Sequence, residues 1–408
     1  MERTTCCIAG GGPAGMVLGL LLARAGIEVT VLEKHGDFLR DFRGDTVHPT
    51  TLEMLDDLGL GERFARLPQN RIHEVGVPLE DGFQRIGNLR LLSGKYDYIA
   101  MVPQWDLLNL LAEAAGEYPN FTLRMNTEAT GLIMEGETIR GVHYRTADGG
   151  TGELHAALTV AGDGRHSALR AASGLESRSW PVPFDIWWFR LPRKENEPEA
   201  LFPVFTKERP FILINRGEYW QAAAIIRKGS DAQQRREPVS ELLAPAVAGP
   251  VPWLADRVDA LKSWDDVKLL DVRLDRLRRW HRGGLLCIGD AAHAMSPVGG
   301  VGINLAVQDA VAAGRILAPA LRRGRVSPAR LARVRRRRLP ATFLVQRMQR
   351  LLHEKALRPA LEGRFEVTAQ RQPFPIRMIR RYPRLEKIPA RLIGRGFRPE
   401  KIPTWARR

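Results

Sequence analysis

Cysteine is scarce in this 408-residue chain, and long hydrophobic runs are missing near its start. The three cysteines, Cys6, Cys7 and Cys287, cannot form a disulfide framework, and all lie in short apolar runs typical of buried strands. The apolar run at residues 16–23 is far shorter than the roughly 20 residues of a membrane-spanning helix, and glycines interrupt the sequence before a signal-peptide core could form. These absences favour a reducing, cytoplasmic setting.

Several classes of enzyme site are also missing from the sequence. No CxxC or HxH pair and no group of carboxylates has the spacing of a metal site, and no GxSxG turn carries a serine nucleophile. We therefore predict neither a bound metal nor a serine hydrolase. The 44% share of hydrophobic residues is typical of a globular chain, and the length suggests about two or three domains.

The formal net charge of +16 would suggest a nucleic-acid or membrane-surface protein, but this charge is unevenly distributed. Residues 322–408, here called the C-terminal arm, carry a net +21, whereas residues 1–321 carry −5. The arm has an almost continuous run of arginines at 333–338 and apolar residues spaced as in helices. We expect either a solvated helical face packed on the body or a surface that contacts anionic membrane lipids or coenzyme phosphates. Motifs of RNA-binding domains are absent, so no nucleic-acid partner is expected.

The first of three glycine-rich segments follows a short β-prone run. Residues 4–9 predict a strand, GGGPAG follows at residues 10–15, residues 16–25 predict an apolar helix, and residues 28–32 predict a buried strand that ends on Glu33. This order is the βαβ fingerprint of dinucleotide binding. Its glycines let backbone N–H groups approach a pyrophosphate, and the acid can accept hydrogen bonds from a ribose. The segment alone does not distinguish FAD from NAD, and a glycine-rich turn without a ligand is the alternative.

Two further segments repeat the pattern of a strand that ends in a glycine and an aspartate. Residues 158–170, LTVAGDGRHSALR, place a short strand before Asp163, and residues 285–290, LLCIGD, place one before Asp290. GGVG at 299–302 then opens an apolar helical stretch. Flexible backbone at a helix N-terminus suits a polar or anionic ligand edge. A glycine-rich lead-in that only packs is the alternative.

Together, the three segments resemble the flavin-dependent monooxygenases of the aromatic-hydroxylase type, which have the para-hydroxybenzoate hydroxylase fold. GGGPAG with Glu33 resembles the ADP-binding turn of that family. D-G-x-x-S-x-x-R, from Asp163 to Arg170, resembles the motif that serves both FAD and the nicotinamide coenzyme. GDAAHAMSP, from Gly289, resembles the motif whose aspartate binds the ribityl chain. The resemblance spans most of residues 4–321.

The resemblance also implies individual site residues. Arg43 would lie near the flavin, and Gln104, which opens a predicted helix, would contact the ribityl chain or the pyrophosphate. Val301 stands where many members have a glutamine, so a backbone contact would remain while a side-chain contact would be lost. His48 is a candidate base, because imidazole titrates near working pH, and a loop or capping role is the alternative. The implied FAD-binding residues are Gly10, Gly12, Ala14, Gly15, Glu33, Lys34, Arg43, Gln104, Asp163, Asp290, Pro297, Gly300, Val301, Gly302 and Asn304.

The middle of the chain, residues 175–281, is rich in aromatic side chains and predicts a sheet. Seven of the nine tryptophans lie here, and runs such as FDIWWFRL, FILIN and YWQAAAII are typical of strands. Residues 89–102 predict another strand on the substrate side. In the family that the chain resembles, such a sheet covers the active site. We expect most of these aromatics to form sheet core and the rest to line an apolar cavity for a planar substrate.

The fold class implied by the resemblance is α/β, with a Rossmann-like FAD-binding domain, an inserted β-sheet substrate domain and the helical, basic C-terminal arm. The predicted boundaries are 1–72, 103–172 and 281–321 for the FAD-binding domain, 73–102 and 173–280 for the substrate domain, and 322–408 for the arm.

The implied activity is hydroxylation by FAD at the expense of NADH or NADPH. In that chemistry the coenzyme reduces FAD, O₂ forms a hydroperoxide at flavin C4a, and an oxygen atom passes to an aromatic or other electron-rich hydrophobic small molecule. Two alternatives remain open at this point. One is an FAD-dependent reductase or dehydrogenase of a prenyl-like substrate, and the other is a non-enzymatic basic protein that binds membranes or nucleic acid with a vestigial nucleotide fold.

Overall fold

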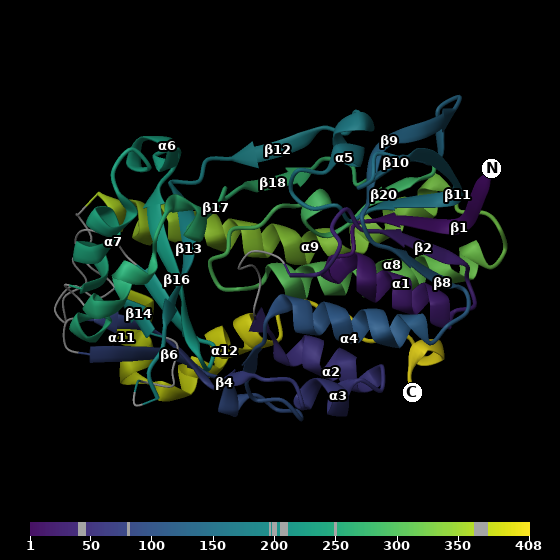
Figure 1. The fold of residues 1–408 in the computed structure, drawn as a ribbon. Coiled ribbons are helices and arrows are strands. Elements are labelled where there is room, and N and C mark those ends of the chain that lie inside the picture. Colours follow the sequence, from purple (N-terminus) through teal and green to yellow (C-terminus); the bar gives the residue numbers. More distant parts are fainter. Residues whose placement is uncertain are drawn as a thin grey trace.

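A mixed eight-stranded sheet forms the centre of the fold (Figure 1). Its strands are β1 (Glu2–Ala9), β2 (Val29–Leu32), β8 (Phe121–Arg124), β9 (Thr127–Glu135), β10 (Thr138–Thr146), β11 (Thr151–Ala161), β19 (His281–Arg282) and β20 (Leu285–Cys287). β1 lies between β2 and β11 and is parallel to both, β2 is also parallel to β8, and β11 is also parallel to β20. The computed structural model describes residues 1–39, 46–79, 82–195, 197, 202–204, 211–248, 251–362 and 374–408.

Helix α1 (Pro13–Arg24) connects β1 to β2 and confirms the βαβ unit that the sequence predicts. Its residues 14–23 are all buried, because the helix packs between the sheet, α4 (Gln104–Gly116) and α8 (Gly302–Leu321). The helix begins at Pro13, three residues earlier than predicted, because proline favours the first position of a helix. Proline has the φ angle of a first helical turn, and its missing N–H would have no partner there.

A second, antiparallel sheet forms the other half of the molecule (Figure 1). In spatial order its strands are β14 (Phe202–Val204), β15 (Phe211–Asn215), β16 (Tyr219–Arg227), β13 (Phe184–Pro192) and β17 (Lys268–Leu270). Side chains alternate along each strand, so the two faces of the sheet carry different residues. One face buries Trp187 and Trp220 in a core shared with α7 (Val239–Ala248), and the other packs Phe184 into a core with Met295.

Smaller elements surround the two sheets. They are the paired strands β12 (Ser177–Trp180) and β18 (Leu274–Leu277), the sheet of β3 (Thr46–Val47), β7 (Ile99–Met101) and β4 (Asn70–Ile72), the hairpin β5 (Glu74–Leu79) and β6 (Gly82–Asn88), and the helices α2 (Pro49–Asp57), α3 (Gly61–Ala65), α5 (Ala168–Ala172) and α6 (Asp231–Gln234). The strand predicted at 89–102 is mostly wrong. A 3₁₀ turn occupies Leu89–Leu91 and only β7 is a strand, because the chain turns at Gly94, whose φ of +131° lies outside the range of a β-strand.

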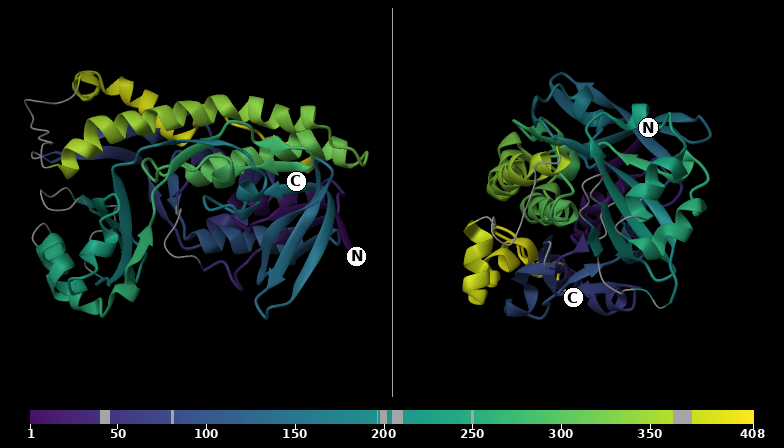
Figure 2. Two further views of the ribbon diagram at one scale, coloured as in Figure 1. Left: turned by 90° about the horizontal axis from the view of Figure 1, so that it is seen from above. Right: turned by 90° about the vertical axis from the view of Figure 1, so that its left-hand side faces the viewer.

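The C-terminal arm is helical, as predicted, and packs on the body of the protein. It contains α9 (Pro328–Leu352), α10 (Arg358–Leu361), α11 (Phe374–Arg381) and α12 (Lys387–Gly394). Helix α9 runs alongside α8 and extends toward the second sheet (Figure 2). The last residues return to the end of α2, where the Arg408 N–H donates to the carbonyl of Asp57 at 3.0 Å. The fold class is confirmed, while the predicted residue boundaries of the domains stay a prediction.

Candidate functional site

Three loops meet at one edge of the eight-stranded sheet, where β1, β11 and β20 end (Figure 1). Main-chain hydrogen bonds hold these ends side by side. The Gly162 N–H donates to the Ala9 carbonyl at 2.8 Å, and the Ile288 N–H donates to the Ala161 carbonyl at 3.0 Å. The carboxyl ends of parallel strands are where open α/β sheets bind their ligands. The three glycine-rich segments, far apart in the sequence, therefore form one site.

The first loop leaves an open space at the N-terminus of α1. A Cβ atom at Gly10, whose φ is +101°, would lie 2.4 Å from the carbonyl oxygen of Gly162, and one at Gly15 would lie 2.0 Å from that of Gly10. At Gly12, by contrast, an added Cβ would meet nothing within 4 Å. Two glycines thus permit close packing, and the third borders free space at a helix N-terminus, where backbone N–H groups attract phosphate.

Glu33 lies directly after β2 and faces this space. Its carboxylate accepts hydrogen bonds from the N–H groups of Gly11, at 2.9 Å, and His35, at 3.0 Å. The side chain is buried, so its orientation is fixed beside the glycine-rich loop. A carboxylate in this place can accept hydrogen bonds from a ribose diol. Lys34, the next residue, is exposed to solvent.

The second loop is organised by Asp163. Its carboxylate accepts hydrogen bonds from the Ser167 hydroxyl at 2.5 Å and the Leu169 N–H at 3.3 Å. The Ser167 hydroxyl in turn accepts a hydrogen bond from the Arg170 N–H and caps α5. Burial raises the pKa of Asp163, although these hydrogen bonds lower it. The side chains of this motif thus fix its own loop.

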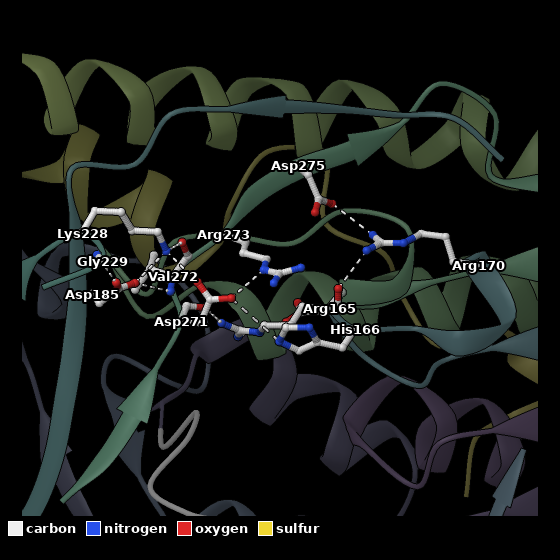
Figure 3. A network of polar contacts seen from close by, with 11 residues as sticks. Arg165, His166, Arg170, Asp185, Lys228, Gly229, Asp271, Val272, Arg273 and Asp275 are labelled. Carbon is white, nitrogen blue, oxygen red and sulfur yellow. Dashed lines mark hydrogen bonds and ion pairs between the residues drawn. The ribbon is translucent and has the colours of Figure 1, made fainter. Parts of the chain in front are cut away.

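Arginines of the second loop bind it to the third. Arg165 donates to the carboxylate of Asp290 at 3.2 Å, so the predicted ribityl-binding aspartate belongs to the same cluster. Arg170 donates to Asp275 at 3.2 Å and to the carbonyl of Ala291 at 3.5 Å. Figure 3 shows both arginines in the polar network that continues toward the second sheet. The second and third motifs therefore act as one unit.

The start of α8 forms another wall of the site. Asn304 accepts hydrogen bonds from the His48 N–H at 3.0 Å and the Thr51 hydroxyl at 2.7 Å, and its amide donates to the Thr46 carbonyl at 3.2 Å. The Thr46 hydroxyl donates to the carbonyl of Gly300 at 2.6 Å. Asn304, predicted to bind FAD, therefore ties α8 to α2 and β3 through its side chain.

His48 is buried at the N-cap position of α2, but its side chain makes no capping hydrogen bond to that helix. Its Nδ1 lies 2.6 Å from the carbonyl oxygen of Ile393. Burial lowers the pKa of His48 to about 4 and outweighs the hydrogen bond to the carbonyl of Ile393, which raises it. The imidazole is therefore neutral near neutral pH. Its role as a base stays a prediction.

Several of the remaining predicted residues lie at the starts of helices α4 and α8. Gln104 is the half-buried first residue of α4, Pro297 is half-buried ahead of α8, and Val301 is the N-cap residue of α8. Arg43 lies outside the described residues. None of the FAD-binding roles is tested by these positions, and all of them stay predictions.

The sequence gives no signal for a buried ionic cluster below the third motif. Asp309 of α8 accepts from the Gly289 N–H at 3.2 Å, lies 2.5 Å from His293 Nε2, and accepts from Arg338 of α9 at 2.9 Å. All three charged or polar side chains are at most 1% exposed. Burial alone would raise the pKa of Asp309, but His293 and Arg338 lower it. The cluster fixes Gly289 and thereby the loop that carries Asp290.

The residues present fit FAD. The open space at Gly12 can hold phosphate, and the carboxylate of Glu33 can accept hydrogen bonds from ribose. Asp290, the predicted partner of the ribityl chain, lies where the second and third loops are joined. Among the residues that the structure describes, no group of His, Cys, Asp or Glu could hold a metal ion. Within the same residues, no helix is long and apolar enough to cross a membrane.

Comparisons with known proteins agree with this site. A family described as FAD binding domain matches residues 3–348. The chain is 37% identical over 361 residues to 6-methylpretetramide 4-monooxygenase from Streptomyces rimosus, covering 85% of this chain and 83% of that protein. It is 29% identical over 333 residues to 12-dehydrotetracycline 5-monooxygenase/anhydrotetracycline 6-monooxygenase from Streptomyces rimosus subsp. rimosus. That match covers 76% of this chain and 62% of that protein.

A solved structure with a similar fold is the OxyS anhydrotetracycline hydroxylase from Streptomyces rimosus. The TM-score is 0.75 at 24% sequence identity, and the match covers 97% of this chain and 76% of that one. At this identity the likeness shows the fold.

Proposed function

Because the chain belongs to the FAD-binding domain family and is an FAD-dependent monooxygenase that consumes NAD(P)H and O₂ to hydroxylate an aromatic compound, we propose that its own substrate is a fused-ring aromatic compound of the tetracycline type. The observation that carries this proposal is the 37% identity to 6-methylpretetramide 4-monooxygenase along 85% of the chain. The relationship favours a monooxygenase over the alternatives of a reductase and a non-enzymatic basic protein.

FAD supplies the oxygen-transfer chemistry when bound, and the protein holds and shields it. The Gly12 cradle and the N-terminus of α1 would bind the pyrophosphate, Glu33 the ribose, and Asp290 the ribityl chain. Arg165 orients Asp290, and Asp309 orients the Gly289 backbone beneath it. These contacts would fix the position of the cofactor relative to the substrate when FAD is bound.

Two polar side chains of the second sheet support a substrate with several oxygen atoms. Trp188 and Gln221 lie on β13 and β16, on the sheet face opposite the one that buries Trp187 and Trp220. In the part of the chain that the structure describes, the indole nitrogen of Trp188 and the amide nitrogen of Gln221 are buried without a hydrogen-bond partner. Buried donors without partners are costly. We infer that carbonyl or phenol oxygens of the substrate accept hydrogen bonds from them.

The proposal is tested with purified, FAD-loaded protein and three probes: 6-methylpretetramide, anhydrotetracycline and the small phenol p-nitrophenol. We expect a fused-ring probe to stimulate NAD(P)H oxidation and to gain one oxygen atom from ¹⁸O₂, with p-nitrophenol much less effective. The variants Trp188→Phe and Gln221→Leu should raise KM for the fused-ring probe while FAD stays bound. Stimulation by p-nitrophenol alone would contradict the substrate class, and oxidation without oxygen incorporation would contradict monooxygenase activity.

A further inference from the structure

A basic pocket lies on the seam between α8 and α9, away from the three loops of the flavin site. It has a volume of about 720 Å³, and the chain segment after α12 closes one side. Arg315, on its α8 wall, follows Gly302 by 13 residues, which corresponds to about 20 Å of helix. The pocket is lined by Arg315, Ile316, Pro319, Arg330, Arg333, Arg336, Arg337, Arg398, Pro399 and Glu400. A ligand bound here would not reach the cofactor.

The arginines come from three separate elements and converge on this space. Those of α9 recur at intervals of three and four residues, so they share one face of the helix. Arg398 reaches the pocket from the C-terminal segment, where its own φ is +52°. The left-handed region is unfavourable for a residue with a side chain, and such strain concentrates at functional sites. The chain thus adopts a costly turn at a residue that lines the pocket.

The positive charge of the pocket is not neutralised by its own acidic residue. Glu400 is the single acid among the lining residues, and Arg337 holds its carboxylate with two nitrogen atoms at 2.7 and 2.8 Å. Within the described ranges, no ion pair involves Arg330, Arg333 or Arg336. Several guanidinium groups therefore face one cavity without a carboxylate partner. Like charges at close range repel, and an anion would relieve that repulsion.

We propose that this pocket binds a compact anion that carries a diphosphate group. All the cations that line it are arginines, whose planar fork binds pairs of phosphate oxygens, which the ammonium of lysine cannot do. The volume is that of a small-molecule site, and its concave shape favours a compact ligand over a nucleic-acid strand or an acidic protein. Inorganic pyrophosphate and the diphosphate of a nucleotide share this chemistry. The pocket is a second anion site, separate from the α1 cradle of FAD.

The experiment uses the FAD-loaded holoenzyme, titrated calorimetrically with inorganic pyrophosphate, ADP and orthophosphate at near-physiological salt. We expect pyrophosphate to bind more tightly than orthophosphate. Arg333→Glu and Arg336→Glu should each weaken the binding of pyrophosphate by about tenfold or more. Arg333→Gln provides a milder variant if the charge reversal impairs folding, and its flavin absorbance reports an intact FAD site.

Arg347→Glu is the matched control, because it reverses one exposed charge on the same helix outside the pocket. Unchanged pyrophosphate affinity in this control supports the proposal. Equal weakening in the control, or a single-stranded oligonucleotide that binds more tightly than pyrophosphate and depends on Arg347, would overturn it in favour of a diffuse basic surface. Absence of pyrophosphate and ADP binding would also overturn it. Tighter binding of ADP than of pyrophosphate identifies a nucleotide as the source of the diphosphate, and equal binding identifies the free anion.

Discussion

At the scale of single residues, the glycines of the first glycine-rich loop meet two different needs. One is required for close packing of the main chain, and we expect another to be required for ligand binding. A methyl group at Gly15 would collide with the main chain of Gly10, whereas one at Gly12 would meet no protein atom. Gly15→Ala should therefore destabilise the FAD-free protein by about 1–3 kcal/mol. Gly12→Ala should leave that stability almost unchanged and weaken FAD binding by about tenfold, since the methyl group would occupy the phosphate cradle.

Thermal unfolding of the FAD-free variants and fluorescence titration with FAD measure the two effects separately. If Gly12→Ala bound FAD as tightly as the parent protein, the cradle would not be the phosphate site.

The buried imidazole of His48 predicts a loss of stability in mild acid. Its folded pKa of about 4 lies below the ordinary value of 6.5, so the unfolded chain binds the proton first as the pH falls. The contribution is fully present above about pH 6.5 and is lost progressively down to about pH 4. Between about pH 7 and pH 5, His48 should account for a loss of about 2 kcal/mol of unfolding free energy.

Urea unfolding of the FAD-free protein at these two pH values checks this prediction for His48. His48→Asn should reduce the pH-dependent loss, while replacement of His143, which is half-exposed on β10, should not. An identical pH dependence in parent and His48→Asn would show that the buried imidazole does not cause it.

Residue types and their spacing were enough to predict where the three loops lie in the sequence, because glycines and aspartates that follow a β-prone run are typical of turns. The roles of Asn304 and His48 were less predictable. Asn304 bonds with residues more than 250 positions away, and a burial that lowers a pKa depends on neighbours that only the folded chain brings together. Trp188 and Gln221 stand out only after strand pairing shows which face each occupies.

At the scale of elements, helix α9 departs at several positions from the ordinary distribution of polar and apolar side chains. Its arginine run predicted a solvated face, and most of these arginines are exposed, yet Arg338 is fully buried. Phe343 and Leu351, in contrast, are about half exposed. Composition could predict the helix but not its orientation. The orientation follows from Asp309 on α8, a carboxylate buried in the core that needs a cationic partner.

Breaking this ion pair should be strongly destabilising, because it leaves Asp309 charged and partly unpaired in the core. Arg338→Gln should lower the free energy of unfolding by about 3–5 kcal/mol. Arg336→Gln, on the exposed side of the same helix, should change it by less than about 0.5 kcal/mol. Chemical denaturation of the FAD-free proteins measures both. Equal stabilities of the two variants would mean that His293 alone satisfies the carboxylate.

At the scale of the whole molecule, Asp271 joins the flavin site to the second sheet (Figure 3). Its carboxylate accepts from Lys228 at 2.6 Å and from Arg273 at 2.6 Å, and its carbonyl accepts from Arg165, which also holds Asp290. Burial would raise the pKa of Asp271, but the two cations outweigh it and lower the pKa to about 2. The sequence predicted both sheets but gave no indication of this joint, because its residues are spread over more than 100 positions.

Asp271→Asn keeps the shape of the side chain, removes its charge and should loosen the joint between the two sheets. Exposed ion pairs contribute less than about 1 kcal/mol each, so we expect the FAD content to be unchanged. The looser joint should lower the amount of hydroxylated product formed per NAD(P)H oxidised by about twofold to fivefold. Since the carboxylate is ionised at every ordinary assay pH, this loss should not vary between about pH 6 and pH 8. Parallel measurement of NAD(P)H consumption, product and hydrogen peroxide gives the ratio. Asp265→Asn, an exposed change of the same charge on the same domain, is the control. An equal loss in both variants would mean that overall charge, and not the joint at Asp271, sets the efficiency of oxygen transfer.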